Sequence, residues 1–180
     1  MRVIAGELKG RRLVAPRGWK VRPTSERVRE ATFSALGEIG GARILDLYCG
    51  TGALAIEALS RGAASAVLVD RDVRPALGNV ERLGLGERVE LIRADVGRWL
   101  SGRSEGEPRR YDLVFVDAPY RLADRVGPEL EIHLPRLLVS GGRAVVESAA
   151  RRPLRLEAPP RLRQRRYGAT DVSFYGEGDS

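Results

Sequence analysis

The amino-acid sequence predicts one α/β domain built on a doubly wound, mostly parallel sheet, and three observations lead to this fold class. The chain of 180 residues suits a single domain, and 43% of the residues are apolar, which allows a buried core without disulfides. From residue 42 onward, short apolar runs alternate with helical patterns, and such alternation requires a parallel sheet covered on both faces. A tail with strand patterns only follows, and its strands are expected to pair antiparallel.

The first forty residues predict a hairpin and a helix. Residues 2–15 indicate two short strands around Lys9-Gly10, which form a basic hairpin. A link rich in Pro and Gly follows from residue 16 to residue 23, and Thr24 or Ser25 then caps a helix that extends to about Leu36. The apolar stripe of this helix comprises Val28, Ala31, Phe33 and Leu36, and its other face carries Arg22, Arg27 and Arg29.

Strands and helices alternate after residue 40. A Gly-rich turn separates the first strand from its helix, and a polar loop is expected at residues 101–110. The strands are expected at residues 42–47, 66–69, 89–93, 111–116 and 143–147, the helices at 53–61, 74–83, 96–100 and 128–138, and the strands of the tail at 154–158, 162–167 and 171–175. The chain therefore divides into a basic extension, residues 1–40, and an α/β domain, residues 41–180.

Positive charge gathers at the two ends of the chain. Lysine and arginine total 31 against 24 acidic residues, and the sequence pI is about 10.3. Residues 1–30 hold nine basic and three acidic side chains, residues 151–180 hold seven and four, and the middle is nearly neutral. A protein that binds a polyphosphate such as a nucleic acid concentrates positive charge in this way. A basic surface that only aids solubility is the alternative.

Several classes of protein are excluded by the composition. Cys49 is the only cysteine, which excludes a disulfide framework and a zinc site built on cysteines. The first residues lack the apolar core of a signal peptide, and no apolar run approaches 18 residues. We expect a soluble, cytoplasmic protein that is a monomer and binds neither a membrane nor a metal.

Four acidic residues mark the predicted ligand site. Asp46, Asp70, Asp95 and Asp117 each lie at or just past the carboxyl end of a different predicted strand. In doubly wound sheets these ends meet at one edge, where ligands bind. We therefore expect the four carboxylates to converge on one crevice.

The segment from Asp46 to Gly52 predicts the class of ligand. Gly50 and Gly52 allow a sharp turn and a close approach of the backbone to a bound group. The residues from Gly50 to Ala55 also fit the dinucleotide pattern G-x-G-x-x-A, so NAD is an alternative, and a purely structural turn is another. A carboxylate at Asp46 would repel a pyrophosphate, whereas it suits the ammonium and sulfonium groups of S-adenosylmethionine. The residues therefore favour S-adenosylmethionine over NAD.

Two further acids fit the same ligand. Asp70 can accept hydrogen bonds from both ribose hydroxyls, which a dinucleotide would also need. Asp95, with Val96, lies where an adenine ring is expected, and its carboxylate can accept from the adenine amine. The alternative role of Asp95 is to cap the next helix.

Asp117-Ala118-Pro119-Tyr120 is the candidate catalytic segment. The exocyclic amine of a nucleobase is a poor nucleophile because its lone pair is delocalised into the ring. Asp117 and the carbonyl oxygen of Ala118 can accept its hydrogens, Pro119 stiffens the turn, and Tyr120 can stack on a flipped base. Methyl transfer then depends on positioning. Alone, this tetrapeptide would be an ordinary turn at a strand end.

Four segments resemble one family of enzymes. These segments run from Arg2 to Gly6, from Lys9 to Leu13, from Arg22 to Glu30 and from Asp46 to Gly52. They are similar to the RsmD family, class I enzymes that transfer a methyl group from S-adenosylmethionine to N2 of one guanine in 16S ribosomal RNA. The resemblance covers nearly the whole chain. It implies a Rossmann-like, seven-stranded sheet with a short N-terminal hairpin and helix extension.

The resemblance also implies roles for single residues and a partner, which is 16S ribosomal RNA, free or in a small-subunit assembly particle. The target guanine would be held by Asp117, Pro119 and Tyr120. The RNA would be gripped by Arg11, Arg12, Arg22, Arg27 and Arg29. The cofactor S-adenosylmethionine would be bound by Asp46, Tyr48, Gly50, Thr51, Gly52, Asp70, Arg71, Asp95, Val96 and Asp117.

One position departs from the family pattern. The family usually has Asp-Pro-Pro-Phe or Asp-Pro-Pro-Tyr where this chain has Asp117-Ala118-Pro119-Tyr120. Ala118 retains its carbonyl oxygen and Pro119 still favours an extended Ala118, so we expect activity with a looser loop. The alternative functions are methylation of DNA adenine or of a protein side chain, a non-catalytic role in ribosome assembly, and NAD-dependent reduction.

Overall fold

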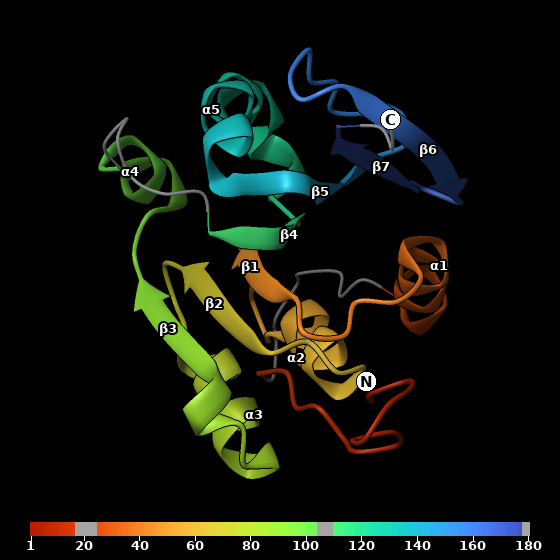
Figure 1. Cartoon of the computed structure of the whole chain (residues 1–180), viewed down its shortest axis with the longest axis vertical. Helices are drawn as coiled ribbons and strands as arrows, with labels where there is room; N and C mark the ends of the chain where they lie inside the picture. The colour runs from red at the N-terminus through yellow and green to blue at the C-terminus, as the bar shows by residue number, and fades with distance from the viewer. Residues whose placement is uncertain (17–24, 104–109, 178–180) are drawn as a thin grey trace.

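A seven-stranded sheet forms the centre of the computed structural model, which describes residues 1–16, 25–103 and 110–177. The strand order is β3-β2-β1-β4-β5-β7-β6 (Figure 1). The strands are β1 (Arg43–Leu47), β2 (Ser65–Asp70), β3 (Val89–Arg93), β4 (Tyr111–Val116), β5 (Leu138–Ala149), β6 (Arg161–Tyr167) and β7 (Thr170–Gly176). Neighbours run parallel from β3 to β5, and β7 is antiparallel to both β5 and β6. The predicted doubly wound sheet with an antiparallel tail is confirmed.

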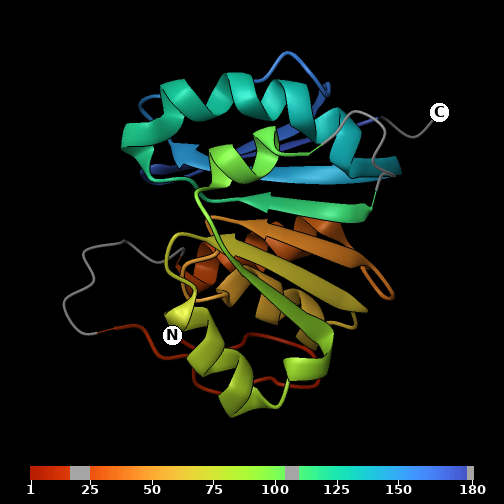
Figure 2. The ribbon, with the colours of Figure 1, turned by 90° about the vertical axis from the view of Figure 1, so that its left-hand side faces the viewer.

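Two hydrophobic cores lie on the two faces of the sheet. Successive side chains of a strand point to opposite faces, so in β1 Ile44 packs toward α1, α2 and α3 while Leu45 packs toward α4 and α5. Figure 2 shows helices on either side of the strands. The helices are α1 (Glu26–Leu36), α2 (Ala53–Ser60), α3 (Arg74–Leu83), α4 (Val96–Ser101) and α5 (Ala123–Leu137), with short 3-10 turns η1 (Gly86–Arg88) and η2 (Tyr120–Leu122).

Most of the predicted elements are confirmed. β3, α3 and β4 begin and end at the predicted residues. β1, α2, α4 and β6 differ from prediction by one residue at one end, and β2 and β7 by one residue at each end. Ser25 caps α1, and its hydroxyl accepts a hydrogen bond from the Val28 N–H at 3.2 Å. Thr24 lies outside the described residues, as do most of the link at 16–23 and of the loop at 101–110.

The strand predicted at residues 154–158 is wrong. Leu154 and Leu156 are two residues apart, as the inward-facing residues of a strand are, because both side chains pack onto the core on the α5 face. In the described chain they pair with no neighbouring strand. Their backbone groups bond side chains instead. The Leu154 N–H donates to Ser148 Oγ at 3.1 Å, and the Leu154 carbonyl accepts from the Tyr175 hydroxyl at 3.1 Å. The alternation therefore indicated a loop in which two leucines face the core.

The last helix and strand of the alternating region are longer than predicted. α5 begins at Ala123 and contains both Pro128 and Pro135, whereas the start was expected at Pro128. Proline is favoured in the first turn of a helix, but a proline in the sequence does not require a helix to begin at that residue. β5 extends beyond the predicted residues 143–147 at both ends, and its pairing with β4 is irregular.

The N-terminal hairpin is shorter than predicted because its turn binds α2. One antiparallel bridge joins Arg2 and Arg12, and the Glu7 N–H donates to the Ser60 carbonyl at 2.8 Å. A Cβ on Gly6 would meet that carbonyl oxygen at 1.7 Å, and the φ of Gly6 is +83°, so this approach requires glycine. The hairpin is therefore held against the end of α2.

A buried carboxylate joins the N-terminal segment to two helices. Glu57 of α2 is fully buried. It accepts hydrogen bonds from the backbone N–H groups of Ile4 at 2.8 Å and Ala5 at 3.0 Å. Arg61 Nε also donates to it at 2.8 Å, and Arg29 Nε of α1 lies 3.5 Å from Glu57 Oε2. Two cations and two backbone donors compensate the charge, as a buried carboxylate requires.

This arrangement corrects one predicted RNA contact. Arg29 does not lie on an outer face of α1: it is completely buried, and its Nη2 donates to the Arg2 carbonyl. Desolvation lowers the pKa of Arg29, and the charge of Glu57 opposes this effect. From this position Arg29 holds the N-terminal segment and does not reach an RNA. Its partner Glu57 is distant in the sequence, so the helical pattern did not reveal the pair.

We expect Glu57→Gln to lower the free energy of unfolding by about 3–5 kcal/mol, because the change leaves the buried guanidinium of Arg29 and the partly buried guanidinium of Arg61 without their charge partner. Chemical denaturation measures the loss. Glu30→Gln is the matched control, since Glu30 is exposed on α1, and it should change stability by less than about 0.5 kcal/mol. Equal stability of the two variants would contradict this role of Glu57.

Candidate active site

The carboxyl ends of the parallel strands bring the predicted acids to one edge of the sheet. Asp46 lies in β1, one residue before its end, and Asp70 is the last residue of β2. Asp95 follows β3, and Asp117 follows β4. The Asp117 N–H donates to the Leu47 carbonyl at 3.3 Å, which fixes the start of the candidate catalytic segment beside β1. The roles of these acids toward a ligand stay predictions.

The turn after β1 is strained and is held by β2. Tyr48 has a φ of +61°, which costs a bulky residue about 1–2 kcal/mol. The N–H groups of Tyr48 and Cys49 donate to the Val69 carbonyl at 2.9 and 3.3 Å, and the Gly50 N–H donates to the Asp70 carboxylate at 3.0 Å. These three bonds hold the turn at the end of β2. The sequence did not predict the conformation of Tyr48.

Gly52 allows α2 to begin close to the sheet. Its φ is +75°, and a Cβ there would lie 3.0 Å from Leu68 Cδ2 and 3.4 Å from the Cβ of Ala76. A larger residue would therefore strain the backbone and displace core side chains. The glycine keeps the N-terminus of α2 near the edge that carries the acids.

Asp46 lies under the N-terminus of α2. Its side chain is buried, Oδ2 accepts from the Ala55 N–H at 3.2 Å, and Oδ1 has no hydrogen-bond partner in the described part of the chain. Burial raises the pKa of Asp46 to about 7, with a smaller contribution from the charge of Asp70, and the bond from Ala55 opposes the rise. One buried acceptor oxygen therefore stays available at this edge.

Asp95 caps α4 and pairs with Arg71. Its Oδ1 accepts from the Arg98 N–H at 3.1 Å, and its Oδ2 accepts from Arg71 Nε at 2.8 Å and from Arg71 Nη2. The cap and then the guanidinium lower the pKa of Asp95. Asp95 therefore has the alternative role considered from the sequence, that of a helix cap. An adenine amine at Asp95 would share the carboxylate with these donors.

A depression of about 370 Å³, which includes open solvent, lies between α4 and α5 beside the Arg71–Asp95 pair. Burial raises the pKa of Tyr48, one of the lining residues, to about 12, so its hydroxyl stays protonated and can donate a hydrogen bond. The lining residues are Tyr48, Arg71, Asp95, Gly97, Leu100, Leu122, Arg125, Val126 and Glu129.

The segment after β4 lies at the same edge. Asp117 is half-buried, Ala118 is buried, and the side chain of Tyr120 is 44% exposed. The Leu122 N–H donates to the Pro119 carbonyl at 2.8 Å, which closes a turn that leads through η2 into α5. A half-buried carboxylate followed by an exposed aromatic ring can hold and stack a nucleobase.

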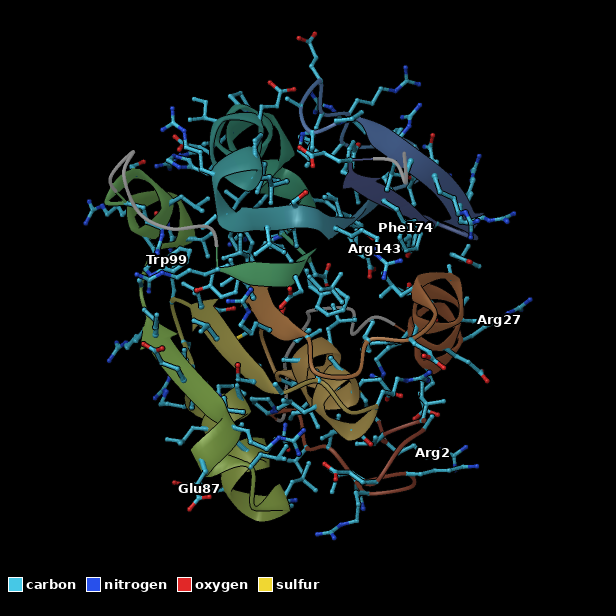
Figure 3. The ribbon with its side chains drawn as sticks, viewed as in Figure 1. Arg2, Arg27, Glu87, Trp99, Arg143 and Phe174 are labelled. Atoms are coloured by element: carbon cyan, nitrogen blue, oxygen red, sulfur yellow. The ribbon has the colours of Figure 1, made fainter. Side chains whose placement is uncertain are left out.

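The predicted RNA contacts lie in different environments. Arg11 and Arg12 of the N-terminal segment and Arg27 of α1 are exposed, and Figure 3 shows Arg27 pointing away from the body of the molecule. Arg22 lies outside the described residues. Arg29 is buried against Glu57, as described above. Three of the five predicted arginines are therefore placed where an RNA could reach them.

Asn79 connects the N-terminal segment to the Gly-rich turn, a link that the sequence did not predict. It is buried in α3 and accepts from the Val14 N–H at 2.9 Å. Its amide nitrogen donates to the carbonyls of Val14 and Thr51, each at 3.0 Å. The segment that carries Arg11 and Arg12 is thereby fixed relative to the turn. Asn79 is the only asparagine of the chain, which is the one sequence signal that singles it out.

Neither metal ligands nor a membrane span are found in residues 1–16, 25–103 and 110–177. In these ranges no three His, Cys, Asp or Glu side chains gather to hold a metal ion, and no helix is long and apolar enough to cross a membrane. Cys49 is buried, and burial raises the pKa of its thiol. The thiol is therefore protonated and unreactive, consistent with its predicted role as a small apolar neighbour of the turn.

We expect Asp46→Asn to change how stability depends on pH. The folded pKa of Asp46 is about 7, above the ordinary value of 3.8, so the folded wild type retains a proton that the unfolded chain releases. Its contribution to the free energy of unfolding is therefore full below about pH 4 and is lost as the pH rises to about 7. The variant should match the wild type within about 1 kcal/mol near pH 4 and exceed it by about 2–4 kcal/mol near pH 8.

Denaturant unfolding at each pH, without added ligand, measures this difference. Asp72→Asn is the control, because the hydrogen bond from Arg74 lowers the pKa of Asp72 to about 2 and the group stays ionised across the range. Parallel stability curves for Asp46→Asn and the wild type would show that Asp46 does not titrate as described.

Residues 1–176 match the profile of the family described as "Conserved hypothetical protein 95". The chain is 39% identical over 125 residues to "Putative rRNA methyltransferase YlbH" of Bacillus subtilis, and this region covers 67% of each protein. It is 37% identical over 125 residues to "Ribosomal RNA small subunit methyltransferase D" of Escherichia coli K12, which covers 67% of this chain and 61% of that protein. The matched region thus spans about three fifths to two thirds of these relatives.

Solved structures share the whole fold. "Putative methyltransferase yhhF from Escherichia coli" has 32% sequence identity and a TM-score of 0.81, with 97% of this chain and 96% of that chain covered. A hypothetical protein of Thermus thermophilus, TTHA0928, has 29% identity and a TM-score of 0.82, with 98% and 99% covered. The predicted class I methyltransferase fold is therefore confirmed. Because the family profile matches nearly the entire chain, the protein belongs to the Conserved hypothetical protein 95 family, which confirms the RsmD family predicted from its sequence.

Proposed function

We propose that this chain transfers the methyl group of S-adenosylmethionine to the N2 amine of a guanine in 16S ribosomal RNA. The observation that carries the proposal is the family match over residues 1–176, which includes both the Gly-rich turn and the segment Asp117-Ala118-Pro119-Tyr120. A relative that matches over two thirds of this chain is "Ribosomal RNA small subunit methyltransferase D" of Escherichia coli. The chain is an S-adenosylmethionine-dependent rRNA methyltransferase.

The acids at the edge of the sheet fit a positively charged cofactor. Asp46 keeps one buried oxygen without a partner in the described chain, and Asp70 and Asp95 lie at the same edge. These charges oppose a pyrophosphate and suit an ammonium or a sulfonium. When bound, S-adenosylmethionine supplies an electrophilic methyl group. We assign its methionine part to Asp46, Gly50 and Gly52, its ribose to Asp70 and its adenine to Asp95 and Val96, with further contacts from Tyr48, Thr51, Arg71 and Asp117.

Asp117 and Ala118 act on the target amine. The carboxylate of Asp117 and the carbonyl oxygen of Ala118 accept its two hydrogens, which keeps the lone pair on nitrogen and directs it toward the methyl group. As the nitrogen–carbon bond forms and the carbon–sulfur bond breaks, the amine becomes acidic, and Asp117 can accept the released proton. Pro119 holds the turn, and Tyr120 stacks on the guanine. Positioning contributes most of the rate.

The RNA-binding extension comprises residues 1–40, and the methyltransferase domain comprises residues 41–180. Arg11, Arg12 and Arg27 bind phosphate groups, because they are exposed and no acidic side chain pairs with them in the described chain. Arg22, in the most family-specific segment, belongs with them. The substrate is 16S ribosomal RNA, free or in a small-subunit assembly particle, and the enzyme acts as a monomer in the cytoplasm.

Asp117→Ala should lower kcat by about 100-fold or more, because the target amine loses an acceptor. Transfer of labelled methyl groups to a 16S ribosomal RNA transcript or to small-subunit particles measures turnover, and calorimetry should show binding of S-adenosylmethionine within about tenfold of the wild type. Asp112→Asn is the control, since Asp112 lies at the opposite end of β4 and pairs with exposed Arg43. Normal turnover in Asp117→Ala would show that the catalytic assignment is wrong, and a wild type that does not bind S-adenosylmethionine would refute the function.

Tyr120→Ala should raise KM for the RNA by about 5- to 100-fold, because stacking on a base contributes about 1–3 kcal/mol. Tyr120→Phe keeps the ring and should stay within about twofold. Mass spectrometry of the product identifies the methylated atom, and a methyl group at any position other than guanine N2 would refute the proposed target. An unchanged KM in Tyr120→Ala would remove this ring from the RNA contact.

A further inference from the structure

We propose, on the basis of the function proposed above, that strand β6 binds the phosphate backbone of the same RNA and forms a second contact surface apart from the N-terminal extension. Arg163 and Arg165, here called the β6 arginine pair, are the groups that make the contact. Neither residue belongs to the predicted RNA-binding set.

β6 presents its side chains to solvent. It is the last strand of the sheet and pairs with β7 alone, and every residue from Arg161 to Arg166 is exposed. Between residues 151 and 167 the chain has seven arginines and one acidic residue, Glu157. Four of these arginines lie in β6, which makes this edge of the sheet positive.

The β6 arginine pair differs from other exposed arginines of this protein. Arg43 pairs with Asp112 at 3.0 Å, and Arg74 pairs with Asp72 at 2.7 Å. Neither guanidinium of the β6 pair has a carboxylate partner in the described chain. No carboxylate of the described residues therefore neutralises their charge.

The acid next to β6 is already occupied. Asp171 of β7 is buried, and it accepts hydrogen bonds from Gln164 Nε2 at 2.7 Å and from Ser173 Oγ at 2.9 Å. Asp171 lies opposite Arg166, whose Nε donates to the Gly168 carbonyl instead. Asp171 is thus hydrogen-bonded by neutral side chains, and it does not pair with the β6 arginine pair. These arginines can therefore bind an external anion.

Both members of the pair lie on the α1 face of the sheet. Arg163 is paired with Phe174 and Arg165 with Val172, and these two β7 residues belong to the core that also contains the buried face of α1. Alternate residues of a strand are about 6.6 Å apart, which is similar to the separation of neighbouring phosphates in an RNA strand. Figure 3 shows Phe174 and Arg27 on the same side of the molecule, where nitrogen-tipped side chains project from β6.

The direction of the strands brings this surface toward the catalytic edge. β6 is antiparallel to β7, which is antiparallel to β5, so β6 ends at the edge where β1 and β4 end. β6 is three strands from β4 in the sheet, a separation of about 14 Å. An RNA whose guanine reaches Asp117 can therefore pass its flanking backbone across α1 and the β6 arginine pair.

RNA fits this surface better than another protein strand does. A second copy of this chain that paired through β6 would place arginine opposite arginine, which is destabilising. A guanidinium fork binds phosphate oxygens in a bidentate geometry, and two unpaired forks in a row suit a chain of phosphates. There are two alternatives. The arginines could bind an acidic protein, or their charge could only prevent β6 from pairing with a strand of another molecule.

The double variant R163Q/R165Q tests the contact. We expect its affinity for a 16S ribosomal RNA transcript to fall about tenfold at physiological salt. The slope of log K against log salt should decrease in magnitude by about 1.4–1.8, because two phosphate contacts are lost. Binding of S-adenosylmethionine, measured by calorimetry, should not change, which shows that the variant is folded. R163K/R165K keeps the charge and should keep the slope.

R82Q/R110Q is the matched control, because it removes two exposed arginines, one on α3 and one just before β4, away from the catalytic edge. Its salt slope should equal that of the wild type. An unchanged slope in R163Q/R165Q, or an equal decrease in both double variants, would overturn the proposal.

Two further outcomes would also overturn it. If R163Q/R165Q loses activity only on small-subunit particles and keeps wild-type binding to bare RNA, the partner of β6 is a protein. If the variant only aggregates in size-exclusion chromatography and keeps its salt slope, the arginines protect the edge of the sheet. A wild type that binds RNA but transfers no methyl group would refute the proposed function, while the salt slopes would still decide the β6 contact.

Discussion

The hydrogen bonds between the turn after β1 and the end of β2 position the groups at the carboxyl edge. Tyr48 keeps its unfavourable φ because the Val69 carbonyl and the Asp70 carboxylate receive the N–H groups of the turn. The turn also sets where Gly52 begins α2, and α2 supplies the bond from Ala55 that holds Asp46. The Gly-rich turn therefore depends on a neighbouring strand that is adjacent in space and separate in sequence.

The N-terminal extension is continuous with the core of the domain. Glu57 binds its backbone beneath α1, and Asn79 binds Val14 and the Gly-rich turn with a single side chain. Buried polar groups of this kind are costly unless every donor and acceptor is satisfied, so they specify one arrangement of the segment. A surface for RNA on this extension is thereby held in a defined place relative to the turn that the cofactor is proposed to contact.

Arginine has two different tasks in this chain, in which only two of 31 basic residues are lysine. Arg29 and Arg71 neutralise carboxylates and hold the fold or the rim of the depression. Arg27 and the β6 arginine pair have no such partner in the described chain and remain available to phosphate groups. The composition indicated a polyanionic partner, but it did not separate the two groups, because an ion pair depends on which acids the fold brings near.

The sequence alone determined the class of fold, most element boundaries to within one residue, the Gly-rich turn and the edge at which the acids meet. Those features follow from local periodicity, capping and the rule that parallel strands end together. Tertiary structure alone decided that Arg29 is buried, that residues 154–158 form a loop on the α5 face and that Asp95 binds Arg71. These outcomes depend on contacts between residues far apart in the chain, and no local pattern encodes such partners.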